Sequence, residues 1–60
     1  MTAAEVIALR ERTGLTQEGL ARRMRLSVST IRHWEQGLRT PKGPTLMMLE
    51  IIARETEKGK

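Results

Sequence analysis

The chain has 60 residues, a formal net charge of +4, one histidine, no cysteine and no aspartate. A chain of this length forms one small domain, residues 1–60, that buries only about 60% of its unfolded surface, so a large catalytic cleft would be difficult to build. The absence of cysteine excludes a disulfide framework and a thiolate metal site. With no nucleophile–base set and no phosphate-cradling glycine loop, we expect no enzymatic activity, no cofactor and no metal.

Positive charge is concentrated in the middle of the chain. Residues 22–42 carry six arginine or lysine residues against one glutamate, whereas residues 1–21 sum to −1 and residues 43–60 to zero. Clustered basic residues are typical of a nucleic-acid interface, although the solvated surface of a small soluble protein can have the same composition.

Membrane association is not predicted. No apolar run reaches the roughly 18 residues of a membrane span, and the N-terminus lacks a basic segment followed by an apolar one. We therefore expect a cytoplasmic protein with neither a transmembrane helix nor a signal peptide.

The first predicted helix spans about Ala3–Thr13. Thr2 and Glu5 have the spacing of a capping box, and Gly14 can end the helix in the left-handed conformation. No segment of the chain alternates apolar and polar residues as a strand does, so the fold class is predicted to be all-α.

Two short helices follow in close succession. One spans about Gln17–Met24 after the N-cap Thr16, and the next spans about Val28–Gln36 between the N-cap Ser27 and Gly37. Two helices joined by a turn of three or four residues are the pattern with which proteins place a helix in the major groove of DNA.

The last predicted helix begins with Pro44, at the position that proline prefers, and runs to about Glu55. Residues 38–43 form a loop before it, and residues 56–60 are predicted to be a frayed tail. The chain is therefore predicted to be a compact four-helix domain of the repressor type, with a helix-turn-helix in its second and third helices. In its last helix, either Ile52 or Met48 is expected to lie beside the inward-facing residues. The residues expected to face inward are Val6, Leu9, Thr13, Leu20, Ala21, Met24, Ile31, Trp34, Leu46, Leu49 and Ala53.

Residues at fixed spacings carry a family resemblance. Gly14-Leu15-Thr16-Gln17 followed by Leu20-Ala21, with Ile31, Glu35 and Gly37, resembles the phage-repressor/Cro-type (XRE-like) helix-turn-helix family over about Val6 to Ala53. The stretch Ile31 to Gly37, with Pro41, Gly43-Pro44 and a last helix rich in Leu, Met and Ile, is more narrowly similar to HigA/MqsA-type antitoxins.

The resemblance implies a sequence-specific transcriptional regulator that binds double-stranded DNA. It implies a repressor acting as a homodimer on a two-fold operator, and an antitoxin that autoregulates its operon and binds a cognate toxin. The protein would be bacterial or phage-encoded and associated with the nucleoid.

Two residues depart from the family pattern. Arg25 stands in the turn after the second helix, where the family usually has a glycine with positive φ, and a side chain there costs about 1 kcal/mol. Gly19 stands where a glutamate commonly completes the capping box with Thr16, and glycine is a weak helix former. Both predict a less stable second helix.

The start and outer face of the third helix are predicted to contact base edges in the groove. Ser29 can donate or accept a hydrogen bond, and Val28 can contact a thymine methyl group. Arg32 suits guanine O6 and N7 but suits a phosphate equally well, and His33 can donate to either or lie on the surface with no such role. The predicted base-contact residues are Ser27, Val28, Ser29, Arg32 and His33.

A second group is predicted to contact phosphates. Gln17 opens the second helix, whose free N–H groups and partial positive charge favour an anion, and the resemblance implies a backbone contact for this glutamine. The others surround the end of the third helix, and the alternative for them is a loop that is merely charged. The predicted phosphate-contact residues are Gln17, Gln36, Arg39, Thr40 and Lys42.

Two further roles are structural. The resemblance implies an ion pair between Arg10 and Glu35 that joins the first and third helices. Trp34 lies three residues after Ile31 and is predicted to belong to the core, with base stacking as the alternative.

The last helix has more apolar residues than one buried face requires. Met47 and Ile51 lie one turn apart with no expected partner inside the domain, which is typical of a surface for a second copy or another protein. The alternative is a helix that is fully buried. This surface also supports a second hypothesis for the whole protein: an antitoxin or adaptor that mainly binds a protein through its last helix.

Overall fold

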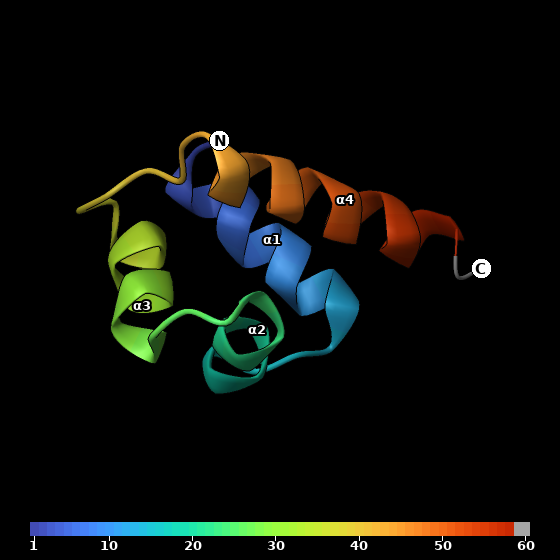
Figure 1. Ribbon diagram of the computed structural model, residues 1–60, viewed down its shortest axis with the longest axis horizontal. Coiled ribbons are helices and arrows are strands. Elements are labelled where there is room, and N and C mark those ends of the chain that lie inside the picture. The colour runs from blue at the N-terminus through green and yellow to red at the C-terminus, as the bar shows by residue number, and fades with distance from the viewer. Residues whose placement is uncertain (59–60) are drawn as a thin grey trace.

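The computed structural model describes residues 1–58, and these form four α-helices without a strand (Figure 1). The first three helices, α1 (Ala3–Thr13), α2 (Gln17–Met24) and α3 (Val28–Gln36), have the predicted bounds. The all-α fold class with a helix-turn-helix in α2 and α3 is therefore confirmed. None of the described helices is both long enough and apolar enough to cross a membrane.

Helix α4 (Pro44–Lys58) is longer than predicted. The expected end near Glu55 is wrong, whereas the expected fraying of the tail from residue 56 stays a prediction. Residues 59–60 lie outside the described part. Two hydrogen bonds lie near the expected end: Glu55 accepts one of 2.5 Å from Arg23 of α2, and the Thr56 hydroxyl donates to the carbonyl of Ile52 at 2.9 Å.

The predicted caps form as expected. The backbone N–H of Thr2 donates to the Glu5 carboxylate at 2.7 Å, and the Thr2 hydroxyl accepts from the N–H of Glu5 at 3.2 Å. The hydrogen bond from the Thr2 N–H lowers the pKa of the Glu5 carboxyl group. Thr16 and Ser27 cap α2 and α3 in the same way, each accepting from the N–H three residues later. The bounds of the helices are thus set by local hydrogen bonds.

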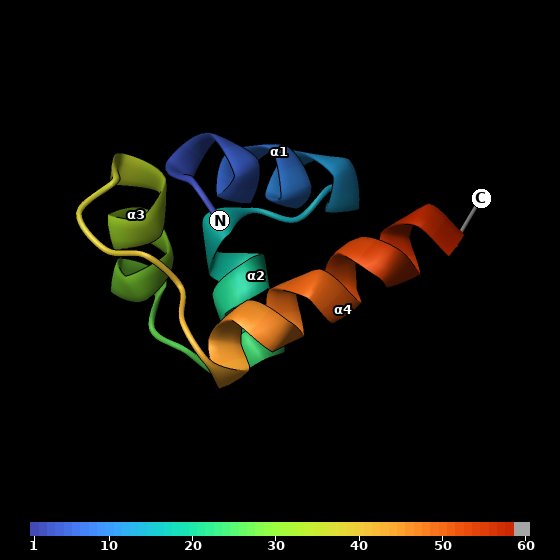
Figure 2. The same ribbon diagram turned by 90° about the horizontal axis from the view of Figure 1, so that it is seen from above.

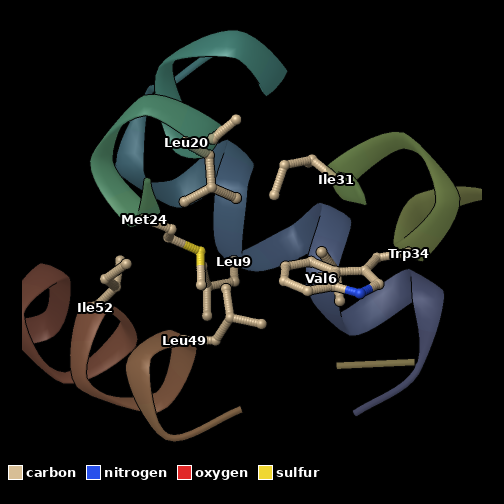
Figure 3. Close-up of a cluster of buried hydrophobic side chains, with 9 residues drawn as sticks. Val6, Leu9, Leu20, Met24, Ile31, Trp34, Leu49 and Ile52 are labelled. Carbon is tan, nitrogen blue, oxygen red and sulfur yellow. The ribbon is translucent and has the colours of Figure 1, made fainter. Parts of the chain in front are cut away.

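The core is formed by side chains from all four helices (Figure 3). Trp34 is only 4% exposed, which confirms its core position and excludes base stacking. In α4 the residue beside Leu49 is Ile52 and not Met48. Thr13 was expected to face inward but is half-buried, because its hydroxyl bonds the carbonyl of Arg10 and the N–H of Leu15. The buried hydrophobic residues are Val6, Leu9, Leu20, Ala21, Met24, Ile31, Trp34, Leu49 and Ile52.

Helix α3 is displayed at one end of the molecule. It packs against α2 and α1, whereas α4 packs mainly against α1. Figures 1 and 2 show α3 at one end of the long axis and the C-terminal end of α4 at the other. The outer face of α3 is therefore free of the other helices.

Candidate nucleic-acid interface

The buried side of α3 determines which residues face outward. Ile31 and Trp34 are anchored in the core, so the side chains between them turn away from it. Of the predicted base-contact residues, Ser29 and Arg32 are exposed, whereas Val28 and His33 are half-buried.

Ser27 differs from the other predicted base-contact residues because its hydroxyl is engaged within the protein. It accepts from the N–H of Thr30 at 3.3 Å and lies 3.0 Å from the Thr30 hydroxyl. This is the ordinary geometry of a helix N-cap. Ser27 therefore orients the first turn of α3, and its contact with a base stays a prediction.

A hollow of about 310 Å³ lies between the start of α2 and α3. It brings Gln17, at the start of α2, together with Val28 and Arg32 of α3. The remaining lining residues, Thr16 and Glu18, were not predicted to belong to the site, although their position on either side of Gln17 could have indicated it. A predicted phosphate-contact residue and two predicted base-contact residues thus line one concave surface.

The predicted pair of Arg10 and Glu35 is present. Arg10 donates to the two carboxylate oxygens of Glu35, from Nε at 2.5 Å and from Nη2 at 3.3 Å, and also donates from Nη1 to the carbonyl of Leu15 at 3.1 Å. The side chains are 18% and 7% exposed, respectively. This bidentate geometry links α1 to α3 and to the segment that leads into α2.

Gln17 is part of the same network, which sequence reasoning did not predict. Its Nε2 donates to Oε1 of Glu35 at 2.9 Å. Burial of the Glu35 carboxylate opposes ionisation, but the hydrogen bonds from Arg10 and Gln17 outweigh it and lower the pKa of Glu35. The side chain at the start of α2 is therefore oriented by the partly buried carboxylate of Glu35 on α3.

The loop after α3 begins with a tight turn. Gly37 has φ 80°, and the N–H groups of Leu38 and Arg39 donate to the carbonyl of His33 at 2.9 and 3.3 Å. Pro41 is buried, which fixes the middle of the loop. The loop is thus attached to the end of α3 and does not extend freely from it.

A second hollow, of about 350 Å³, lies in this loop. It is lined by three of the predicted phosphate-contact residues, Arg39, Thr40 and Lys42, and by Leu38, which was not predicted. Gln36 is exposed on the last turn of α3 but does not line the hollow. Donor side chains are therefore present at both ends of the outer face of α3.

The α4 patch consists of Met47, Met48 and Ile51, which are 63%, 44% and 45% exposed. The expected exposure of Met47 and Ile51 is confirmed, and a fully buried last helix is excluded. Met48 extends the patch on the side of α4 that carries Glu55. Since Glu55 is paired with Arg23, this side faces α2.

Comparisons with known proteins agree with this geometry. A family model described as a helix-turn-helix domain matches residues 3–54. The chain is also 30% identical over 53 residues to antitoxin HigA-2 of Vibrio cholerae serotype O1. That match covers 88% of this chain and 51% of the relative, so the chain spans about half the length of that protein. No solved structure matches. The predicted resemblance is confirmed by both matches.

Proposed function

The chain belongs to the helix-turn-helix domain family, and from this premise we propose that it is a sequence-specific DNA-binding regulator of transcription that does not act as an enzyme. The observation that carries the proposal is the hollow shared by α2 and α3, where Gln17 lies beside Val28 and Arg32. When the start of α2 rests on a phosphate, the first turns of α3 lie within reach of base edges in the major groove.

Phosphate contacts on both sides of α3 would determine how it sits in the groove. On one side, the N–H groups of the first turn of α2 and the Gln17 amide are the donors. On the other side, Arg39, Thr40 and Lys42 line the second hollow. The excess charge of residues 22–42 supports this assignment, because phosphate contacts supply most of the affinity for DNA.

We propose that the protein represses transcription as a homodimer on a two-fold operator. One module reads only a few base pairs, and two modules about one helical turn (roughly 34 Å) apart supply the affinity and specificity that one lacks. The exposed α4 patch is the surface that we assign to the second copy.

The relative named an antitoxin supports a second assignment. We propose that the chain is the DNA-binding part of an antitoxin that autoregulates its operon and binds a cognate toxin.

In the rival hypothesis the protein is mainly an antitoxin or adaptor that binds another protein through α4, and DNA binding is secondary. The two hypotheses differ in a measurable way, because the main interaction of a DNA-binding regulator weakens steeply with salt, whereas the main interaction of an adaptor, with a protein through the apolar α4 patch, should not.

Base reading is tested with Ser29→Ala and His33→Ala. Each variant is expected to select a different preferred sequence from a random duplex library, with a change of about 1–3 kcal/mol at one position. The physical reason is that each change removes hydrogen-bonding atoms that face a base edge. Selection of the parental sequence by both variants would show that the outer face of α3 does not read DNA.

Phosphate contact is tested with Arg39→Ala and Lys42→Ala. Each variant should bind specific and non-specific duplexes more weakly by the same factor, and the slope of log K against log salt should decrease in magnitude by about 0.9. Affinities measured over a salt series provide this slope. A loss confined to the preferred sequence would instead assign these side chains to base reading.

A further inference from the structure

The turn between α2 and α3 contains a strained residue. Arg25 has φ 60° and ψ 42°, and it is the one non-glycine residue with positive φ within residues 1–58. Its N–H closes α2 by donating to the carbonyl of Arg22 at 3.2 Å. Any residue can make this backbone bond, and glycine makes it without the steric cost of a Cβ atom. The arginine therefore makes this turn less stable than glycine would.

Nothing within the described residues compensates for this cost. Met24 is buried and Leu26 packs against the core, so Arg25 between them projects outward and is exposed. No hydrogen bond or ion pair of its side chain is found within residues 1–56, in contrast to Arg10 and Arg23. The favourable charge at the end of α2 is already supplied by two arginines in its last turn.

The position of Arg25 relative to Gln17 indicates what the side chain does. Helix α2 has eight residues, a length of about 12 Å at 1.5 Å per residue. The major groove of B-DNA is also about 12 Å wide. If α2 lies across the groove with Gln17 on the phosphates of one strand, Arg25 at its other end comes near the backbone of the opposite strand. It also lies two residues before Ser27, the cap of α3.

We propose that Arg25 binds a backbone phosphate on the strand opposite to the one that Gln17 contacts, so that α2 spans the groove with a donor at each end. This inference rests on the proposed DNA-binding function. It explains why a strained arginine is present: its cationic side chain strengthens binding at the expense of the stability of the turn.

The test compares Arg25→Gly and Arg25→Lys with the parent on a random-sequence duplex of about 20 base pairs over a salt series, together with thermal unfolding. Arg25→Gly is expected to raise Tm by about 4–8 °C, because glycine relieves the backbone strain at this position. A domain of this size has a small entropy of unfolding, so a modest gain in stability shifts its Tm by several degrees. It should also decrease the magnitude of the salt slope by about 0.9, because one phosphate contact is lost. Arg25→Lys keeps the charge and the strain, so both quantities should stay close to the parental values.

Arg54→Gln is the matched control, because it removes one exposed positive charge from α4. It should leave the salt slope unchanged, and an equal decrease in this control would overturn the proposal, since net charge alone would then explain the effect. A parental slope retained by Arg25→Gly would overturn it too, and so would a lower Tm, which would assign the side chain to the fold. Failure of the parent itself to bind the duplex would contradict the DNA-binding function.

Discussion

Replacing Arg10 by methionine or Glu35 by glutamine is expected to lower the free energy of unfolding by about 2–4 kcal/mol each. The pair is bidentate and largely shielded from water, so removing one partner leaves the other without its ionic bond in a place that water reaches only in part. Urea unfolding followed by the fluorescence of Trp34, the single tryptophan, measures this effect.

The double variant should cost less than the sum of the single changes, because the second substitution removes the partner that the first one left unpaired. The pair of Arg23 and Glu55 is a suitable control, since its side chains are 48% and 58% exposed and such surface pairs contribute about 0–1 kcal/mol. Additive effects of Arg10→Met and Glu35→Gln would contradict the coupling.

The dependence of stability on pH gives a second test of the pair of Arg10 and Glu35. Folding lowers the pKa of Glu35 below its ordinary value of 4.5, so the stability contributed by the ionised carboxylate is complete above that value. It is lost as the pH falls through the lowered pKa. We therefore expect the parent to lose stability more steeply below pH 4.5 than Glu35→Gln does. Parallel acid curves would show that the carboxylate contributes little.

Changing Met47 and Ile51 together to glutamate is expected to leave the monomer folded and to abolish cooperative occupancy of two half-sites. Both side chains are exposed, so charge at these positions does not disturb the core. In a two-fold contact each glutamate would face the apolar patch of the other copy, where desolvating it is costly. Occupancy is measured on a duplex that carries two copies of the sequence selected from the random library.

The size of the patch determines when dimers form. The exposed parts of Met47, Met48 and Ile51 amount to at most a few hundred Å², well below the roughly 800 Å² per partner of a stable interface. Dimerisation without DNA should therefore be weak, and adjacent half-sites would complete it by raising the effective concentration.

A matched control places the same two charges elsewhere. Ala4→Glu combined with Ala8→Glu alters exposed positions of α1 and should keep cooperative binding. If the α4 double variant binds cooperatively as before, the dimer uses another surface. If it unfolds, Met47 and Ile51 support the core despite their exposure.

Local signals in the sequence determined most of the helix bounds. Thr2, Thr16 and Ser27 begin three helices, and Gly14 and Gly37 end two of them, because caps are hydrogen bonds between residues at most a few positions apart. The apolar spacing within each helix likewise indicated most of the buried positions, since one helix presents residues three and four apart on the same face.

Tertiary structure alone decided how those faces meet. It placed Ile52 and not Met48 beside Leu49 in the core, paired Glu55 of α4 with Arg23 of α2, and directed the Gln17 amide to Glu35. It also buried Pro41 and formed the two hollows. These features depend on the distances and angles between helices that are far apart in the chain, and no local pattern of residues specifies those distances.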